Sequence, residues 1–198
     1  MTDTPPSIDP ARTALLVMDF QNAIVDMLEN PEELLARAED AIARVRDRDG
    51  HVGYVRVAFA DADYEDIPET SMMGARVASS GTAFHADSPT TQLHDRVAPV
   101  DGDIIVRKTR VGAFSTTDLD EQLRERDVDT LILAGISTSG VVLSTVRDAS
   151  DRDYRAYVLA DASADPEPGV HEFLTERIFP RQAHVITVAE LEDRLVAS

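Results

Sequence analysis

The 198-residue sequence contains no cysteine. It therefore has no disulfide bond, no thiolate metal ligand and no thiol nucleophile. Its longest apolar runs are too short to cross a bilayer, and the first residues, MTDTPPSIDP, have neither the basic nor the apolar region of a signal peptide. These absences predict a cytoplasmic protein with no membrane partner, whose chemistry does not begin with a cysteine.

Basic residues are also scarce, since 19 Lys and Arg stand against 37 Asp and Glu and the formal net charge is -18. An acidic protein of this kind repels phosphate backbones, which predicts no nucleic-acid partner. The length and a hydrophobic content of 43% allow one core of sufficient size. We therefore expect residues 1–198 to form a single domain.

Short apolar runs rich in β-branched residues alternate with amphipathic stretches, a pattern typical of βαβ units and a mostly parallel sheet. Strands are expected at about 13–18, 51–58, 103–107, 130–134, 155–160 and 183–187. Helices are expected over about 31–48, from 118, over about 139–151, over 168–178 and from 188. Right-handed crossovers then put helices on both faces of the sheet.

The stretch from about 60 to 102 interrupts this alternation, because it holds several prolines and glycines and no sustained periodicity. Loops of this length in a compact domain are usually functional lids or poorly ordered segments. The side chains of Met72, Met73, Phe84 and His85 favour a lid or a dimer contact.

Candidate functional residues follow three of the expected strands, where ligands bind in open parallel sheets. Asp19 ends the first strand, Lys108 ends the third, and the turn from Gly135 to Ser139 opens the helix after the fourth. Taken singly, each has a structural explanation as a turn residue, a solvated lysine or a helix start. Taken together, they indicate an acid/base and anion-stabilising site at one edge of the sheet.

Three segments carry a resemblance to a known family. MDFQN, VRKTRVGAFSTTDLDEQL and LAGISTSGVVLSTVRDASDRDY resemble the signature regions of the isochorismatase-like (cysteine hydrolase) superfamily, and the similarity extends from about residue 13 to residue 195. The resemblance implies an α/β fold with three layers, α/β/α, around a six-stranded parallel, Rossmann-like sheet of order 3-2-1-4-5-6, and a homo-oligomer, most simply a dimer. It also implies that Asp19 and Lys108 are catalytic.

The same resemblance implies a cis peptide between Ile136 and Ser137, in a turn that continues through Thr138 and Ser139. In amidase members this turn reads G-x-x-T-x-x-C, and the cysteine attacks a carbonyl group. The same spacing from Gly135 leads here to Val141, which cannot attack. Hydroxyl groups occur nearby at Ser137, Ser139 and Ser144, but the last two are displaced from that position and none of the three has a recognisable histidine base.

A metal site is not expected. Nicotinamidases carry an Asp-x-His cluster after the second strand, whereas this chain reads VRVAFADAD there, and its five histidines show no ligand spacing. The sequence therefore predicts a hydrolase that needs no metal or other cofactor.

True isochorismatases provide a precedent for a member without the cysteine, because they keep the aspartate and lysine, place glycine at the nucleophile position and hydrolyse a vinyl ether. By this resemblance Asp19 is a general acid that Lys108 holds in place. Val141 is bulkier than glycine, which argues against isochorismate itself and for a related bond in another small molecule. The alternative is a catalytically silent member that binds a small molecule or a protein. Substrate contacts are expected from Gln21, Phe59, Arg110 and Phe114, with Arg110 suited to a carboxylate.

Overall fold

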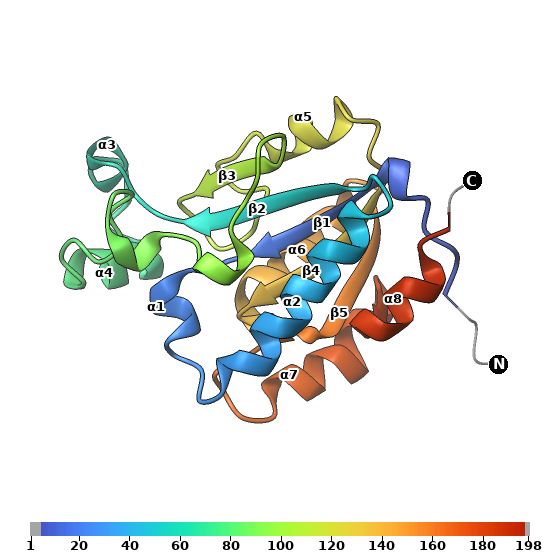
Figure 1. The fold of residues 1–198 in the computed structure, drawn as a ribbon. Helices are drawn as coiled ribbons and strands as arrows, with labels where there is room; N and C mark the ends of the chain where they lie inside the picture. The colour runs from blue at the N-terminus through green and yellow to red at the C-terminus, as the bar shows by residue number, and fades with distance from the viewer. Residues whose placement is uncertain (1–4, 197–198) are drawn as a thin grey trace.

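A computed structural model describes residues 5–196 and contains one six-stranded sheet (Figure 1). The strand order is β3-β2-β1-β4-β5-β6, and every neighbouring pair is parallel, which confirms the predicted fold class and order. The strands are β1 Thr13–Met18, β2 His51–Val57, β3 Ile104–Lys108, β4 Thr130–Ile136, β5 Arg155–Ala164 and β6 His184–Ile186.

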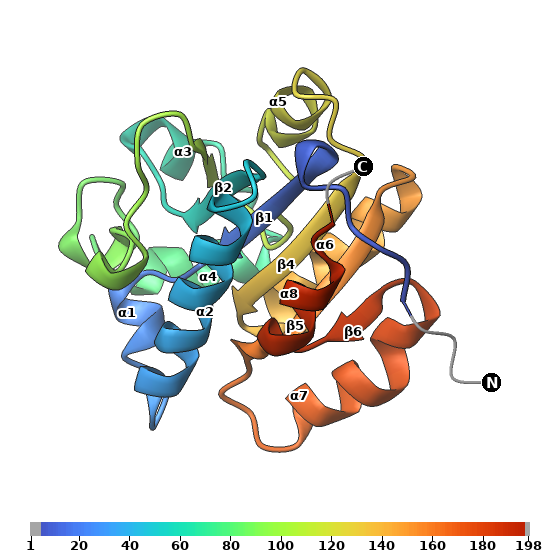
Figure 2. The ribbon, with the colours of Figure 1, turned by 45° about the vertical axis from the view of Figure 1, so that its right-hand side comes forward.

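Helices cover both faces of this sheet. The helices α2 (Pro31–Arg46) and α8 (Val188–Arg194) lie on one face, and α5 (Leu119–Arg124) and α6 (Leu143–Asp151) lie on the other (Figure 2). Within residues 5–196, the short helices α1 (Asn22–Val25) and α7 (Val170–Phe173) complete the α-helices outside the 60–102 stretch, and 3-10 turns lie at Pro10–Arg12 and Phe179–Arg181. No helix within residues 5–196 has the length and apolar composition that a bilayer crossing requires.

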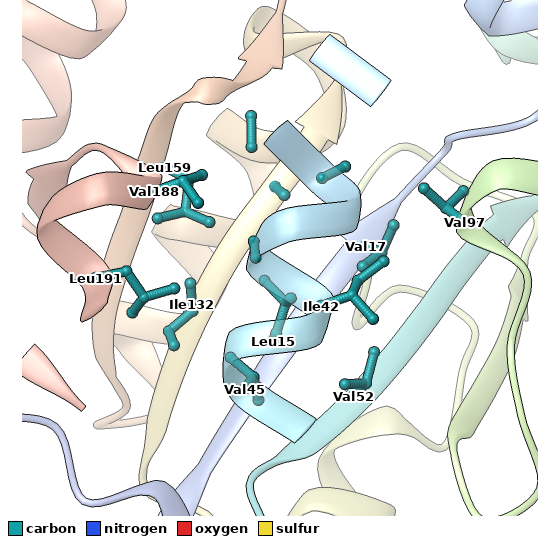
Figure 3. Packing of buried hydrophobic residues seen from close by; sticks show 14 of the residues in the cluster. Leu15, Val17, Ile42, Val45, Val52, Val97, Ile132, Leu159, Val188 and Leu191 are labelled. Atoms are coloured by element: carbon teal, nitrogen blue, oxygen red, sulfur yellow. The ribbon is translucent and has the colours of Figure 1, made fainter. Parts of the chain in front are cut away.

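The first strand shows why its sequence is a continuous apolar run. Leu15 and Val17 pack with Ile42 and Val45 of α2 (Figure 3), while alternate residues such as Leu16 point to the opposite cluster. Because successive side chains of a strand point to opposite faces, a strand covered on both faces must be apolar at every position. All six residues of β1 and all seven of β4 are buried, so these two strands form the centre of the core.

Some boundaries differ from the prediction. The helix expected from 139 begins as a π-helical turn over Thr138–Val142 before α6, and the helix expected over 168–178 starts as α7 and continues as a second π-helical turn, Leu174–Ile178. The last helix is α8, as expected.

The 60–102 stretch contains regular structure that the sequence pattern did not indicate. It holds α3 (Asp61–Glu65), α4 (Met72–Ser79) and two 3-10 turns, Pro89–Thr91 and Asp95–Val97. Helices of about two turns or fewer are too short to produce a sustained apolar period, which is why the sequence pattern did not indicate them. In Figure 1, α3 and α4 lie beyond the carboxyl end of β2.

The apolar side chains of this stretch differ in their exposure to solvent. Val77 of α4 is fully buried, and Met73 and Phe84 pack beside it against Phe59, whereas Met72 remains exposed. Since these contacts lie within one chain, the predicted dimer contact stays a prediction.

Candidate active site

An ion pair between Asp19 and Lys108 lies at the carboxyl edge of the sheet. The distance from Lys108 Nζ to Asp19 Oδ2 is 2.9 Å, and the two side chains are 2% and 7% exposed. The first and third strands flank β2, with Met18 opposite Val55 and Val57 opposite Lys108. Two strand spacings of about 4.8 Å separate the two backbones, a gap that the long lysine side chain spans.

The backbone around the pair fixes its geometry. Asp19 has a left-handed φ of 60°, and its N–H donates to the Val55 carbonyl at 2.8 Å. Lys108 Nζ donates a second hydrogen bond, of 3.2 Å, to the Arg110 carbonyl. An aspartate tolerates this backbone conformation better than most residues, so the carboxyl group leaves the strand at a defined angle.

The two oxygens of Asp19 have different surroundings. Oδ2 accepts from Lys108, whereas Oδ1 is buried and has no hydrogen-bond partner. Burial raises the pKa of Asp19 above its ordinary value, and the charge and hydrogen bond of Lys108 offset only part of that rise. The Asp19 carboxyl therefore has one oxygen held by Lys108 and one buried oxygen without a partner.

The turn after β4 completes the floor of the site. The peptide bond from Ile136 to Ser137 is cis, and Ser137 Oγ accepts from the Gly140 N–H at 3.1 Å. The Ser139 N–H donates to Asp165 Oδ2 at 2.7 Å, which ties the turn to the segment after β5. Behind the turn, the buried Thr138 hydroxyl is hydrogen-bonded to Nδ1 of His171 at 2.8 Å.

A cavity of ≈ 670 Å³ opens above this floor. Asp19, Lys108, Ser137, Ser139 and Val141 all line it. Its apolar wall comes from α1, α4 and their neighbours and includes Ile24, Met27, Leu28, Met73 and Phe84. The volume lies within the range of small-molecule sites.

Val141 occupies the position where amidase members carry the cysteine, and its side chain is both part of the cavity lining and part of the core on the α5 and α6 face. It is 2% exposed. The cavity therefore coexists with the valine, and an apolar branched group lies beside the ion pair.

Two of the expected substrate contacts lie outside the lining of this cavity. Phe59 and Phe114 are buried in core clusters, Phe59 against Tyr64 and Phe84 and Phe114 against Tyr154, and neither lines the cavity. Both follow or lie near strands, but their side chains pack inward because each completes an apolar cluster.

The other two expected contacts are polar. The Arg110 side chain does not line the cavity, since its guanidinium donates to the Thr109 carbonyl at 2.7 Å, and only its own carbonyl contacts Lys108. Gln21 does line the cavity, but its amide is committed to the backbone. It donates to the carbonyls of Val57 and Thr91 and accepts the Val57 N–H. Gln21 therefore joins the end of β2 to the 3-10 turn Pro89–Thr91.

Sequence reasoning missed Arg76, Asp165 and Glu167, which line the cavity. No motif marked them, because Arg76 lies in the stretch without periodicity and the two acids resemble ordinary turn residues.

No group of three or more His, Asp or Glu side chains within residues 5–196 is arranged to hold a metal ion. After β2, the Asp63 carboxylate accepts from the Arg107 guanidinium at 2.5 Å, which compensates its charge internally. The prediction that the chain needs no metal stays a prediction.

Comparison with known proteins agrees with this geometry. The isochorismatase domain matches residues 13–190. The chain belongs to the isochorismatase family. Within the family it is similar to a ureidoacrylate amidohydrolase of Methylobacterium radiotolerans, with 32% identity over 184 residues that cover 83% of this chain and 71% of that protein. A probable isochorismatase of Pseudomonas chlororaphis is 33% identical over 186 residues, 93% of this chain and 87% of that protein.

The fold is also similar to that of solved proteins of this family. A solved isochorismatase family protein from Burkholderia thailandensis has a TM-score of 0.83 and 26% identity, and the match covers 97% of this chain and 99% of that one.

Proposed function

We propose that this isochorismatase-family chain is a hydrolase that acts on a small molecule through Asp19, with no covalent enzyme intermediate. The observation that carries the proposal is the buried carboxyl of Asp19, which faces the cavity with one oxygen held by Lys108 and the other unpartnered. Burial raises the pKa of Asp19 and so favours its protonated form, which is the form that a general acid needs.

The absence of a thiol limits the reaction type. Hydrolysis of an amide through a thioester needs a cysteine, and this chain has none. Val141, at the corresponding position, offers only methyl groups to the cavity. Protonation of a substrate carbon by Asp19 does not require a nucleophile on the protein, so the vinyl-ether reaction fits the residues better than amide hydrolysis.

The proposed reaction balances with water alone. Asp19 donates its proton to the terminal enol carbon of a vinyl ether, which leaves an oxocarbenium ion. Water adds to that cation and returns a proton to the Asp19 carboxylate, and the resulting hemiketal separates into a carbonyl compound and an alcohol. Lys108 keeps the carboxylate in place and stabilises its charge after the proton leaves.

Deuterium labelling tests this mechanism. A panel of enol-ether carboxylic acids is incubated with the protein in D2O, and the carbonyl product is examined by NMR. We expect one deuterium on the carbon next to the carbonyl in each product molecule, and no such label with Asp19→Asn. Carbonyl release without carbon-bound deuterium would contradict the proposal, as would turnover confined to amides.

A catalytically silent member that binds a small molecule or a protein is the second candidate. The bulk of Val141 beside the ion pair favours it. Under that hypothesis Asp19→Asn changes the affinity for a neutral ligand little, and no enol ether is turned over.

A further inference from the structure

The cavity takes its ionic groups from separate segments of the chain. On the floor Asp19 and Lys108 compensate each other. Above the floor, Arg76 of α4 lines one part, while Asp165 and Glu167, which follow β5, line another. In Figure 1, α4 lies at the left and the connection from β5 to α7 at the lower edge, so the charges come from two distinct segments.

Arg76 and Glu167 are both exposed, and neither side chain forms an ion pair or a hydrogen bond within the described part of the chain. Asp165 differs from them, because its carboxylate accepts the N–H groups of Ser139 and Glu167 at 2.7 and 3.1 Å. Asp165 thus joins the turn after β4 to the segment after β5, while the side chains of Arg76 and Glu167 are available to a ligand.

We propose that this cavity selects a zwitterionic amino carboxylate, with the carboxylate toward Arg76 and the ammonium group toward Glu167. The inference rests on the proposed function, since it takes the cavity as the substrate site. An apolar body between the two charged groups would contact Ile24, Met73 and Phe84. A guanidinium pairs well with a carboxylate through two parallel hydrogen bonds.

The arrangement disfavours a dicarboxylate. A second carboxylate beside the segment after β5 would meet Glu167 and the nearby Asp165, and like charges in such a site repel each other. Both Arg76 and Glu167 are solvated, so water and salt weaken each contact, and we expect discrimination of several fold rather than of many orders of magnitude.

Four para-substituted benzenes of matched length test the inference by calorimetric titration at pH 7 and constant ionic strength. They are 4-(aminomethyl)benzoate as the zwitterion, terephthalate as the dianion, 4-methylbenzoate as the monoanion and 4-methylbenzylammonium as the cation. We expect the zwitterion to bind with the lowest Kd, at least about fivefold below that of terephthalate.

Two variants separate the charged contacts. With Arg76→Gln the zwitterion should bind no better than 4-methylbenzylammonium, and with Glu167→Gln no better than 4-methylbenzoate. Arg177→Gln and Glu172→Gln are matched controls, because both residues are exposed and lie outside the cavity lining, and they should leave all four affinities unchanged.

Terephthalate binding as tightly as the zwitterion would overturn this inference without contradicting the proposed role of Asp19 in proton transfer. Equal losses of affinity for the zwitterion in the control variants and in the two test variants would also overturn it. Failure of all four compounds to bind would also overturn it, and the deuterium experiment would then decide the proposed function independently.

Discussion

Lys108 Nζ lies 2.9 Å from Oδ2 of Asp19, while Oδ1 of the same carboxyl is buried without a partner. One ammonium therefore fixes the carboxyl group by one oxygen and leaves the other without a partner, in a residue that lines the cavity. A general acid needs this arrangement, because the oxygen that carries the proton must be free to meet the substrate.

Replacing Asp19 by Asn should lower kcat by about 100-fold or more while the protein stays folded, since the amide keeps the shape but cannot transfer the proton. In the wild-type protein the raised pKa of Asp19 extends the protonated form to higher pH, so kcat should fall as pH rises through that pKa. Turnover rates of the variant, and of the wild type as a function of pH, check the two effects on kcat, and circular dichroism checks that the variant is folded. Asp101→Asn, at an exposed position outside the lining, is the control. Full activity in Asp19→Asn would exclude the general-acid role.

Replacing Lys108 by Met leaves the Asp19 carboxylate buried without a cation, which should cost about 3–5 kcal/mol at neutral pH. The sign of the pH dependence follows from the raised folded-state pKa of Asp19. Between its unfolded and folded pKa the native state holds more protons, so the free energy of unfolding decreases as pH rises. Urea unfolding of Lys108→Met should therefore show a deficit that shrinks as pH falls through the folded pKa. The double variant with Asp19→Asn should recover part of the loss, whereas a deficit independent of pH would contradict this account.

Val141→Cys places a thiol beside the Asp19 and Lys108 pair without a large change of volume. We expect this variant, and not the wild type, to lose its activity after treatment with iodoacetamide, because the wild-type chain has no thiol. The wild type should hydrolyse neither nicotinamide nor p-nitrophenyl acetate through an acyl-enzyme, while the variant should show a burst of nitrophenol. A burst from the wild type would mean that one of the nearby serines acts as a nucleophile.

Gln21→Leu removes three buried hydrogen bonds at once, two to the carbonyls of Val57 and Thr91 and one from the Val57 N–H. The Thr91 carbonyl keeps a hydrogen bond from Arg56 at 3.3 Å, whereas each buried backbone group left unpaired costs about 1–3 kcal/mol. The variant should unfold at clearly lower urea concentration, with faster hydrogen exchange at Val57. Gln122→Leu is the control, since the Gln122 side chain makes no hydrogen bond in the part of the chain that the structure describes. Equal losses in both variants would contradict the role of Gln21 as a connector.

The sheet could be predicted because each central strand is a continuous apolar run, which is what burial between two helical layers requires. The end of β5 could not, since its pairing with β4 shifts register between Leu133 and Gly135 and then continues to Ala164, four residues beyond the predicted limit of 160. A bulge of this kind depends on the tertiary contact and leaves no periodic signal.

The floor of the site was predictable for the same reason as the sheet. Asp19 and Lys108 follow directly from strand ends that the parallel topology brings together. The walls were not, because Arg76 and Phe84 reach the cavity only through the path of the chain between β2 and β3. The position of Phe59 outside the lining could not be predicted, because an aromatic residue after a strand can point either way, and here Val77 of α4 completes an apolar cluster around it.

Lys108 is the only lysine of the chain, and its side chain is almost inaccessible to water. An amine-acylating reagent therefore has a single side-chain target in this protein, and that target lies under the cavity. The rate of its acylation measures how often the ion pair separates and the floor opens. A ligand bound above the floor would lower that rate, so the mass of the peptide that contains Lys108, followed over time, reports both the opening and the occupancy of the site and is distinguished from acylation of the α-amino group.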